Sequence, residues 1–119
     1  MRAIPHLMFQ GDREAAIALW SRAFPDLSQK DVGDGVIEAV IAGQRVSLFD
    51  SPQPHDFAFT PSFSFLVDVD TSDDVDRVAG ILGDGGTTMM PLDSYDFADR
   101  FAWVADRFGV NWQIRYAPT

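Results

Sequence analysis

Cysteine is absent from this 119-residue sequence, and lysine occurs once, as Lys30. Without cysteine there is no disulfide, no thiolate nucleophile and no cysteine-based zinc site. The sequence has 9 basic residues against 18 acidic ones, which gives a formal net charge of -9. That charge repels the phosphates of nucleic acids and of anionic membrane surfaces, so we expect neither as a partner. An acidic pocket would favour cationic ligands, but net charge does not locate the acidic groups.

Long apolar runs are also missing. No stretch approaches the roughly 20 apolar residues that a membrane span needs. The first residues lack the apolar segment of a signal peptide, so we expect a cytoplasmic protein. With 46% hydrophobic and 23% charged residues, the composition is that of an ordinary globular protein. The length predicts a single domain over residues 1–119.

The hydrophobic pattern predicts a similar order of elements twice. The first half is expected to hold a strand over 4–10, a helix over 13–24 with Asp12 as N-cap, a turn at 31–35, and a hairpin of strands 36–42 and 45–49. The second half is expected to hold a strand over 62–69, a helix over 73–82 capped by Thr71 or Ser72, a short strand over 87–91, a loop over 93–99, and a hairpin of strands 101–106 and 110–116. This order, a strand, a helix and two or three further strands in each half, predicts an α+β fold of two paired βαβββ modules, residues 1–55 and 56–119. Each module is too small to bury its own sheet and helix alone.

Alternation along the strands divides each sheet into two faces. One face is apolar throughout and is expected to pack on the helix, with members such as Leu7, Phe9, Phe63, Phe65 and Trp112. The opposite face mixes apolar and polar side chains, which is the composition of a small-molecule pocket. We expect this pocket to be lined by His6, Met8, Gln10, Ser62, Ser64, Leu66, Asn111 and Gln113. The alternative interpretation is a sheet face that a second subunit covers.

Specific motifs add to this pattern, above all near the C-terminal end of the sequence. They are Met90-Pro-Leu-Asp-Ser-Tyr95, the aromatic residues Phe97, Phe101 and Trp103, and the run Asp106-Arg-Phe-Gly-Val-Asn-Trp-Gln-Ile114. Upstream, Glu14-Ala-Ala16, Trp20 and Phe24-Pro25 continue the match in order. In these features the chain resembles the PhnB-like, or demethylubiquinone methyltransferase-like, branch of the vicinal-oxygen-chelate (glyoxalase/bleomycin-resistance) superfamily. The resemblance implies paired βαβββ modules that form a curved mixed sheet with a concave cavity, and a homodimer.

The methyltransferase activity in the family's name is not implied by the residues. A methyl donor such as S-adenosylmethionine needs a glycine-rich turn between strand and helix in a larger α/β sheet. Here Gly33-Asp-Gly35 and Gly83-Asp-Gly-Gly86 fall at turns and at a helix end. We expect these glycines to serve backbone conformation instead.

Glyoxalase-type members of the superfamily hold a divalent metal between His, Glu or Gln side chains from four strands. By position, the resemblance places His6 and Gln113 at the first and last ligand positions, and Ser62 at the position that opens the second half. The strand over 45–49, where the remaining ligand belongs, has no His, Glu or Gln beyond its start. A single imidazole, a neutral amide and a hydroxyl make a poor site for a first-row metal. A divalent metal is therefore a possible cofactor with an incomplete ligand set.

Three functions remain open at this stage. The first is a small-molecule-binding protein with a half-apolar cavity and no complete metal site. The second is a metal-dependent lyase, isomerase or dioxygenase of the glyoxalase type, and the third is a dimerisation domain with a vestigial cavity. The weak ligand set favours the first over the second.

Overall fold

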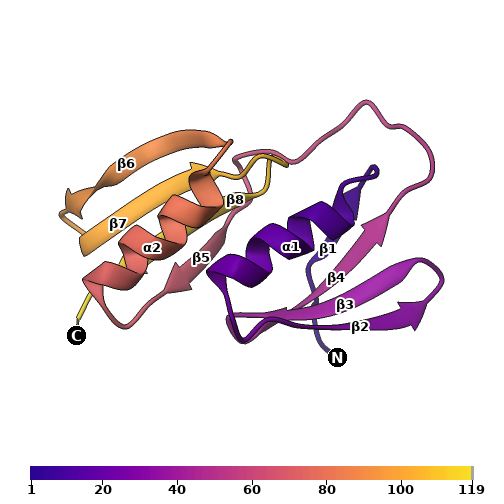
Figure 1. Ribbon diagram of the computed structural model, residues 1–119, viewed down its shortest axis with the longest axis horizontal. Coiled ribbons are helices and arrows are strands. Elements are labelled where there is room, and N and C mark those ends of the chain that lie inside the picture. The colour runs from indigo at the N-terminus through magenta and orange to yellow at the C-terminus, as the bar shows by residue number, and fades with distance from the viewer. Residues whose placement is uncertain (119) are drawn as a thin grey trace. The chain divides into compact units, whose positions relative to one another are not determined.

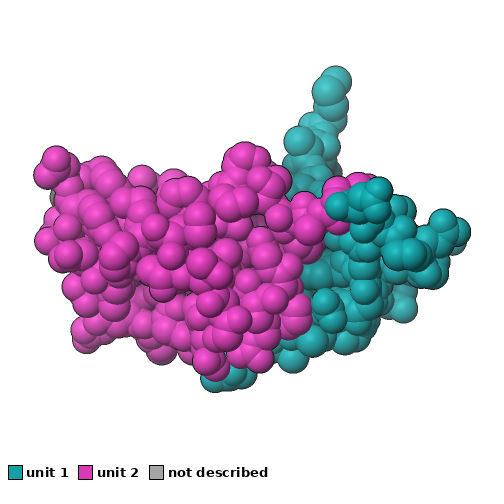
Figure 2. Space-filling view, turned by 90° about the horizontal axis from the view of Figure 1, so that it is seen from above, with its two compact units in different colours: residues 1–56 teal, residues 57–119 magenta. Residues whose placement is uncertain are grey.

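The computed structural model describes residues 1–118 and divides into two compact units, residues 1–56 (unit 1) and 57–119 (unit 2), coloured separately in Figure 2. Each unit has one helix and one four-stranded sheet. Unit 1 contains β1 (His6–Phe9), α1 (Arg13–Ala23), β2 (Ser28–Gly33), β3 (Val36–Ile41) and β4 (Gln44–Asp50). Unit 2 contains β5 (Phe65–Asp68), α2 (Ser72–Gly83), β6 (Thr87–Tyr95), β7 (Ala98–Ala105) and β8 (Asn111–Tyr116). The predicted α+β fold class is confirmed.

In unit 1 the strand order is β1-β4-β3-β2, with β1 parallel to β4 and the other pairs antiparallel (Figure 1). Alternate residues of β1, β3 and β4 are buried in the core with the apolar side of α1. Phe9 of β1 contacts Trp20 of α1, with ring centroids 5.8 Å apart. The predicted apolar face of the first strand, with Leu7 and Phe9, is therefore confirmed.

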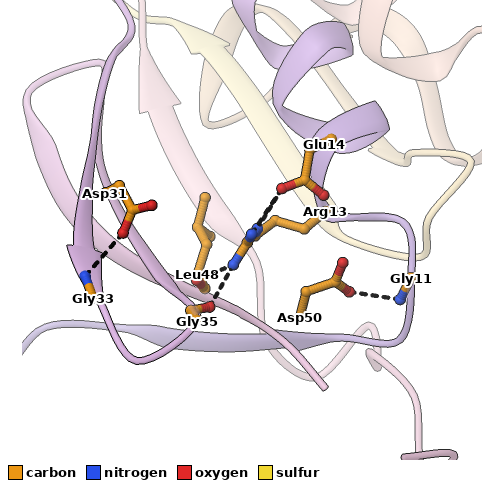
Figure 3. Close-up of polar contacts among 8 residues, drawn as sticks. All are labelled: Gly11, Arg13, Glu14, Asp31, Gly33, Gly35, Leu48 and Asp50. Atoms are coloured by element: carbon orange, nitrogen blue, oxygen red, sulfur yellow. Dashed lines mark hydrogen bonds and ion pairs between the residues drawn. The ribbon is translucent and has the colours of Figure 1, made fainter. Parts of the chain in front are cut away.

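The start of α1 is tied to the sheet by Arg13 (Figure 3). Its Nη1 donates to the backbone carbonyl of Gly35 at 2.6 Å and to that of Leu48 at 3.3 Å. Asp12 occupies the N-cap position, but its side chain makes no capping hydrogen bond, contrary to expectation. The carboxylate of Asp50 instead accepts the backbone N–H of Gly11 at 2.6 Å. The connection from β1 to α1 is thus tied to β4 by Arg13 at the start of the helix and by Asp50 at the end of that strand.

In unit 2 the strand order is β5-β8-β7-β6, and here β5 is parallel to β8. Helix α2 lies against β7 and β8, and its N-cap Thr71 accepts the backbone N–H of Asp74 at 3.1 Å, as predicted. Phe65 stacks on Trp112 with ring centroids 4.9 Å apart. Both units therefore have the same frame, in which the first and last strands are the parallel pair.

A buried carboxylate organises the β7–β8 hairpin. Asp106 is 3% exposed. Its Oδ1 accepts the backbone N–H groups of Phe108 and Val110, and its Oδ2 accepts the indole N–H of Trp112 at 3.0 Å. A buried carboxylate needs such donors, because an unpaired one is costly. The run Asp106–Gln113 that carries the family resemblance thus encodes this turn.

Three predicted element boundaries were wrong in ways that affect the site. Residues 31–33 belong to strand β2 and not to a turn; all six β2 residues are exposed, so no apolar alternation marked them. Strand β6 runs through Pro91 to Tyr95 where a loop was expected, because an edge strand with register shifts tolerates proline. Strand β5 begins at Phe65, and Phe63, expected on the helix, is 51% exposed. Neither helix, within residues 1–118, is long and apolar enough to cross a membrane.

Candidate functional site

Each sheet has a helix-free face, which we define as the face turned away from the helix of its own unit. In unit 1 it carries the residues that alternate with the buried core positions of β1, β3 and β4. Cross-strand partners share a face, so the register assigns Lys30, Glu38, Ser47 and His6 to one row across β2, β3, β4 and β1. We call these four residues the cross-strand row. Met8, Val36 and Phe49 form an apolar row beside it.

The imidazole of His6 is held at two places. Its Nδ1 lies 2.8 Å from Ser47 Oγ, and its ring stacks on Phe49 with centroids 6.3 Å apart. Either Ser47 Oγ or His6 Nδ1 can be the donor, because the hydroxyl rotates and the imidazole has two tautomers. The second ring nitrogen of His6 therefore presents either a donor or an acceptor, at a side chain that is exposed. This His6–Ser47 pair joins the two parallel strands of unit 1.

Glu38 and Arg45 form a bidentate ion pair on the same face. Arg45 Nε donates to Glu38 Oε1 at 2.6 Å, and Arg45 Nη2 donates to Oε2 at 2.9 Å. These hydrogen bonds from Arg45 hold the pKa of Glu38 below its usual range. The only carboxylate of the cross-strand row is therefore ionised at neutral pH and already engaged.

The helix-free face of unit 2 has a matching polar pair. Gln113 Nε2 donates to Ser64 Oγ at 2.9 Å, which joins the parallel strand β8 to the start of β5. Leu66, the cross-strand partner of Gln113, is 50% exposed. Asp68 and Arg115 close one end of this face as an ion pair, with Arg115 Nε 2.6 Å from Asp68 Oδ1.

Aromatic side chains form the other part of the helix-free face of unit 2. Trp103 is the β7 partner of Gln113, and its indole N–H donates to Asn111 Oδ1 at 2.8 Å. Phe101 is buried beneath Tyr95 and Phe97, with centroids 5.6 Å and 4.9 Å away. This face is therefore largely apolar around one amide–hydroxyl pair, and it also carries Asp93, the β6 partner of Phe101.

The other sequence-predicted residues lie as follows. Gln10 comes after the end of β1, and its Oε1 accepts the backbone N–H of His55 at 2.7 Å. Asn111 is 2% exposed and also donates to the carbonyl of Gly109, so it supports Trp103. Ser62 lies in a turn with Thr60, not on a strand, because β5 starts three residues later than the expected position. Ser64 is the residue that contacts Gln113.

Lys30, Glu38 and Ser47 were not predicted as site residues from the sequence. The expected strands 36–42 and 45–49 put the two-residue turn at Gly43-Gln44, whereas the observed turn at Ala42-Gly43 pairs Glu38 with Ser47. The hairpin was therefore predicted, but its register was not. Lys30 was not identified because strand β2, on which it lies, was not predicted.

The donors on these faces do not fit a divalent metal. His6 has a hydroxyl beside it, Glu38 is paired with Arg45, and Gln113 offers only a neutral amide. First-row divalent ions prefer several imidazole or carboxylate ligands. Within residues 1–118, no group of three or more His, Asp or Glu side chains is arranged to hold a metal ion.

The glycine-rich segments serve turns, as expected. Gly33 and Gly35 have φ of 90° and 77° around the β2–β3 turn, and Gly85 has φ of 76° after α2. Positive φ is the conformation that glycine adopts without steric cost. These glycines therefore give no support to binding of a methyl donor.

Comparison with known proteins identifies the family. A family model described as 3-demethylubiquinone-9 3-methyltransferase matches residues 1–115. A PhnB protein from Bacillus cereus is 30% identical, with 98% of this chain and 100% of that chain covered and a TM-score of 0.89. No curated protein matches the chain significantly.

More distant solved structures share the fold. A protein from Pseudomonas aeruginosa is 21% identical over 98% of both chains, with a TM-score of 0.82. The fosfomycin resistance protein FosX from Listeria monocytogenes, solved with Mn(II) and sulfate, is 12% identical over 99% of this chain and 90% of that chain, with a TM-score of 0.72. The chain therefore belongs to the PhnB-like 3-demethylubiquinone-9 3-methyltransferase family, and it has the glyoxalase/bleomycin-resistance fold.

Proposed function

We propose that this protein binds a small molecule at the helix-free face of each sheet taken by itself, without a complete metal site. The observation that carries the proposal is the polar pair on each parallel strand pair, His6–Ser47 in unit 1 and Ser64–Gln113 in unit 2. Each pair is set among apolar side chains, such as Phe49 in one unit and Leu66 in the other. A few fixed polar groups on an apolar surface are what a small-molecule site uses to orient its ligand.

A matched set of three aromatic probes tests this proposal: benzoate, benzamide and benzylamine. Amide chemical shifts of ¹⁵N-labelled protein would be followed during titration with each probe. We expect at least one probe to shift the amides of β1, β4, β5 and β8 more than those of α1 and α2. Ser47→Ala and Ser64→Ala should reduce the shifts in their own units, whereas Ser21→Ala, at an exposed position of α1, should not. Shifts confined to the helices, or no saturable binding of any probe, would contradict the proposal.

The alternative of a metal-dependent lyase, isomerase or dioxygenase of the glyoxalase type is tested separately. Untagged protein purified without chelators would be analysed for Mn, Fe, Co, Ni, Cu and Zn. The donor chemistry predicts less than one bound metal ion per chain. A stoichiometric metal that is lost in His6→Ala would replace the present proposal with the metal-dependent one.

We also propose that the protein is a cytoplasmic homodimer, as the family resemblance implies. Light scattering after size exclusion should give twice the chain mass of 13.2 kDa. A monomer at micromolar concentration would count against this part of the proposal. A dimer without any probe binding would favour the third function, a dimerisation domain with a vestigial cavity.

A further inference from the structure

Positive charge gathers on the helix-free face of unit 1, although the whole chain has a formal net charge of -9. Lys30 is the β2 partner of Glu38, and Arg45 is bonded to the same carboxylate. The hydrogen bonds from Arg45, and the charges of Arg45, Lys30 and Arg2, all act to lower the pKa of Glu38. Three cations therefore act on one carboxylate.

The other carboxylates of unit 1 are placed elsewhere. They lie at the start of α1, in the connections, or opposite residues that face the helix: Asp12, Glu14, Asp26, Asp31, Asp34, Asp50 and Asp56. The net charge of the chain thus does not describe this face. An acidic pocket would favour cationic ligands, but the register places these acidic groups away from the helix-free face.

Arg45 retains donors after pairing with Glu38. Its Nε and Nη2 engage the carboxylate, whereas a guanidinium has five N–H groups in a planar fork. This fork matches the geometry of an oxyanion. Ser47 and His6 add further hydrogen-bonding groups in the adjacent positions of the cross-strand row.

Unit 2 has the same strand order, but its helix-free face carries no such excess of cations. Its ion pair, Asp68 with Arg115, is balanced, and Asp93, the β6 partner of Phe101, adds a negative charge. Nothing on that face repeats the excess of cations around Glu38. The two helix-free faces therefore differ in charge while sharing strand order.

We propose that the cross-strand row of unit 1, together with Arg45, binds a carboxylate or other oxyanion of the small-molecule ligand. This inference rests on the proposed function, and it adds the chemical class of the ligand group and the unit that binds it. The apolar neighbours Met8 and Phe49 lie beside this row and would contact the uncharged part of such a ligand.

The same three probes separate the two proposals. We expect benzoate to shift the amides of Lys30, Glu38 and Ser47, with weaker shifts from benzamide and the weakest from benzylamine. Binding should weaken as NaCl is raised from about 50 to about 300 mM, because salt screens exposed charges. If benzamide or benzylamine binds unit 1 as tightly as benzoate, the charge proposal is overturned and the small-molecule proposal stands. If none of the probes binds, both fail.

Charge variants sharpen the test. Lys30→Gln should weaken benzoate binding about two- to fivefold, the usual effect of one exposed charge. Glu38→Gln should strengthen benzoate binding by a similar factor. The substitution removes the carboxylate of the cross-strand row and frees the guanidinium of Arg45. A gain in affinity cannot come from unfolding. Arg22→Gln, which removes an equal charge from the last turn of α1, is the control and should leave the affinity unchanged. Weaker binding in Glu38→Gln, or equal losses in Lys30→Gln and Arg22→Gln, would overturn the inference.

Discussion

The two units share one strand order and one helix position, but they carry different side chains on their helix-free faces. In both, the first and last strands are parallel, a helix covers one face, and a polar pair lies on the other face of the parallel strands. The helix-free face of unit 1 gathers cations around Glu38, whereas that of unit 2 is aromatic around Gln113 and carries Asp93 beside a balanced ion pair. The comparison teaches that strand order sets where side chains meet, and that the residue at each register position decides what they bind.

The hairpins before the last strands differ as well. Unit 1 turns between β3 and β4 through two residues, Ala42 and Gly43, both at positive φ. Unit 2 turns between β7 and β8 through a longer segment that Asp106 organises from inside. The longer turn depends on a buried carboxylate, and the shorter one depends on backbone conformation alone.

The largest expected effect follows from that difference. Asp106→Ala removes the acceptor for two backbone N–H groups and the Trp112 indole, so we expect a loss of about 3 kcal/mol in the free energy of unfolding. Urea unfolding followed by tryptophan fluorescence measures it. Asp99→Ala, at an exposed position of β7, is the control and should change stability by less than about 0.5 kcal/mol. Equal losses in the two variants would show that the buried carboxylate does not hold the turn.

Glycines in the two units give the next effect. At Gly86 a Cβ would overlap the carbonyl oxygen of Ala105, so Gly86→Ala must displace backbone and should cost about 2–3 kcal/mol. At Gly43 a Cβ has space, but φ is 85°, so Gly43→Ala should cost only about 1 kcal/mol. Gly80→Ala, in the interior of α2 with no close neighbour, should stabilise by about 0.5–1 kcal/mol. Thermal unfolding of the three variants checks this order, and a larger loss at Gly43 than at Gly86 would reverse the interpretation.

The fold class and both helices were predictable because their signals are local. The helical spacing of Ala16, Leu19 and Trp20 and the cap at Thr71 each lie within one element. Strand β2 was not predictable, because its six exposed residues carry no apolar alternation. Its extended conformation is stabilised by hydrogen bonds to β3, and its own sequence does not indicate that pairing. Pro91 likewise suggested a break where the register shifts of β6 accommodate it.

The candidate site was predictable only in part, for a geometric reason. The β3–β4 hairpin was predicted, but its expected turn lay one residue too late, and a shift of one residue changes every cross-strand pair, including Glu38 with Ser47. The offset of a parallel pair is set by the packing of the intervening elements, so the His6–Ser47 contact could not be predicted either. Ser62 was assigned to the strand for the same reason, since nothing local marks where β5 begins to pair with β8.

The smallest effect concerns the two ion pairs, and it compares the units directly. Hydrogen bonds from Arg45 lower the pKa of Glu38, and hydrogen bonds from Arg115 lower the pKa of Asp68. A carboxyl whose pKa is lowered by folding adds stability above its ordinary pKa range and loses that stability as the pH falls through the lowered value. Both groups should therefore titrate below their ordinary ranges when their carboxyl ¹³C shifts are followed by NMR.

Removing the arginines tests the cause of these shifts. Arg45→Gln should return the pKa of Glu38 toward its ordinary range and leave Asp68 unchanged, and Arg115→Gln should do the reverse. The stability difference between wild type and each variant should be largest at neutral pH and should shrink in acid. Lys30→Gln should raise the pKa of Glu38 by a smaller amount and leave Asp68 unaffected, because the extra cations lie only in unit 1. If Lys30→Gln moved both carboxyls or neither, the charge difference between the two faces would have to be abandoned.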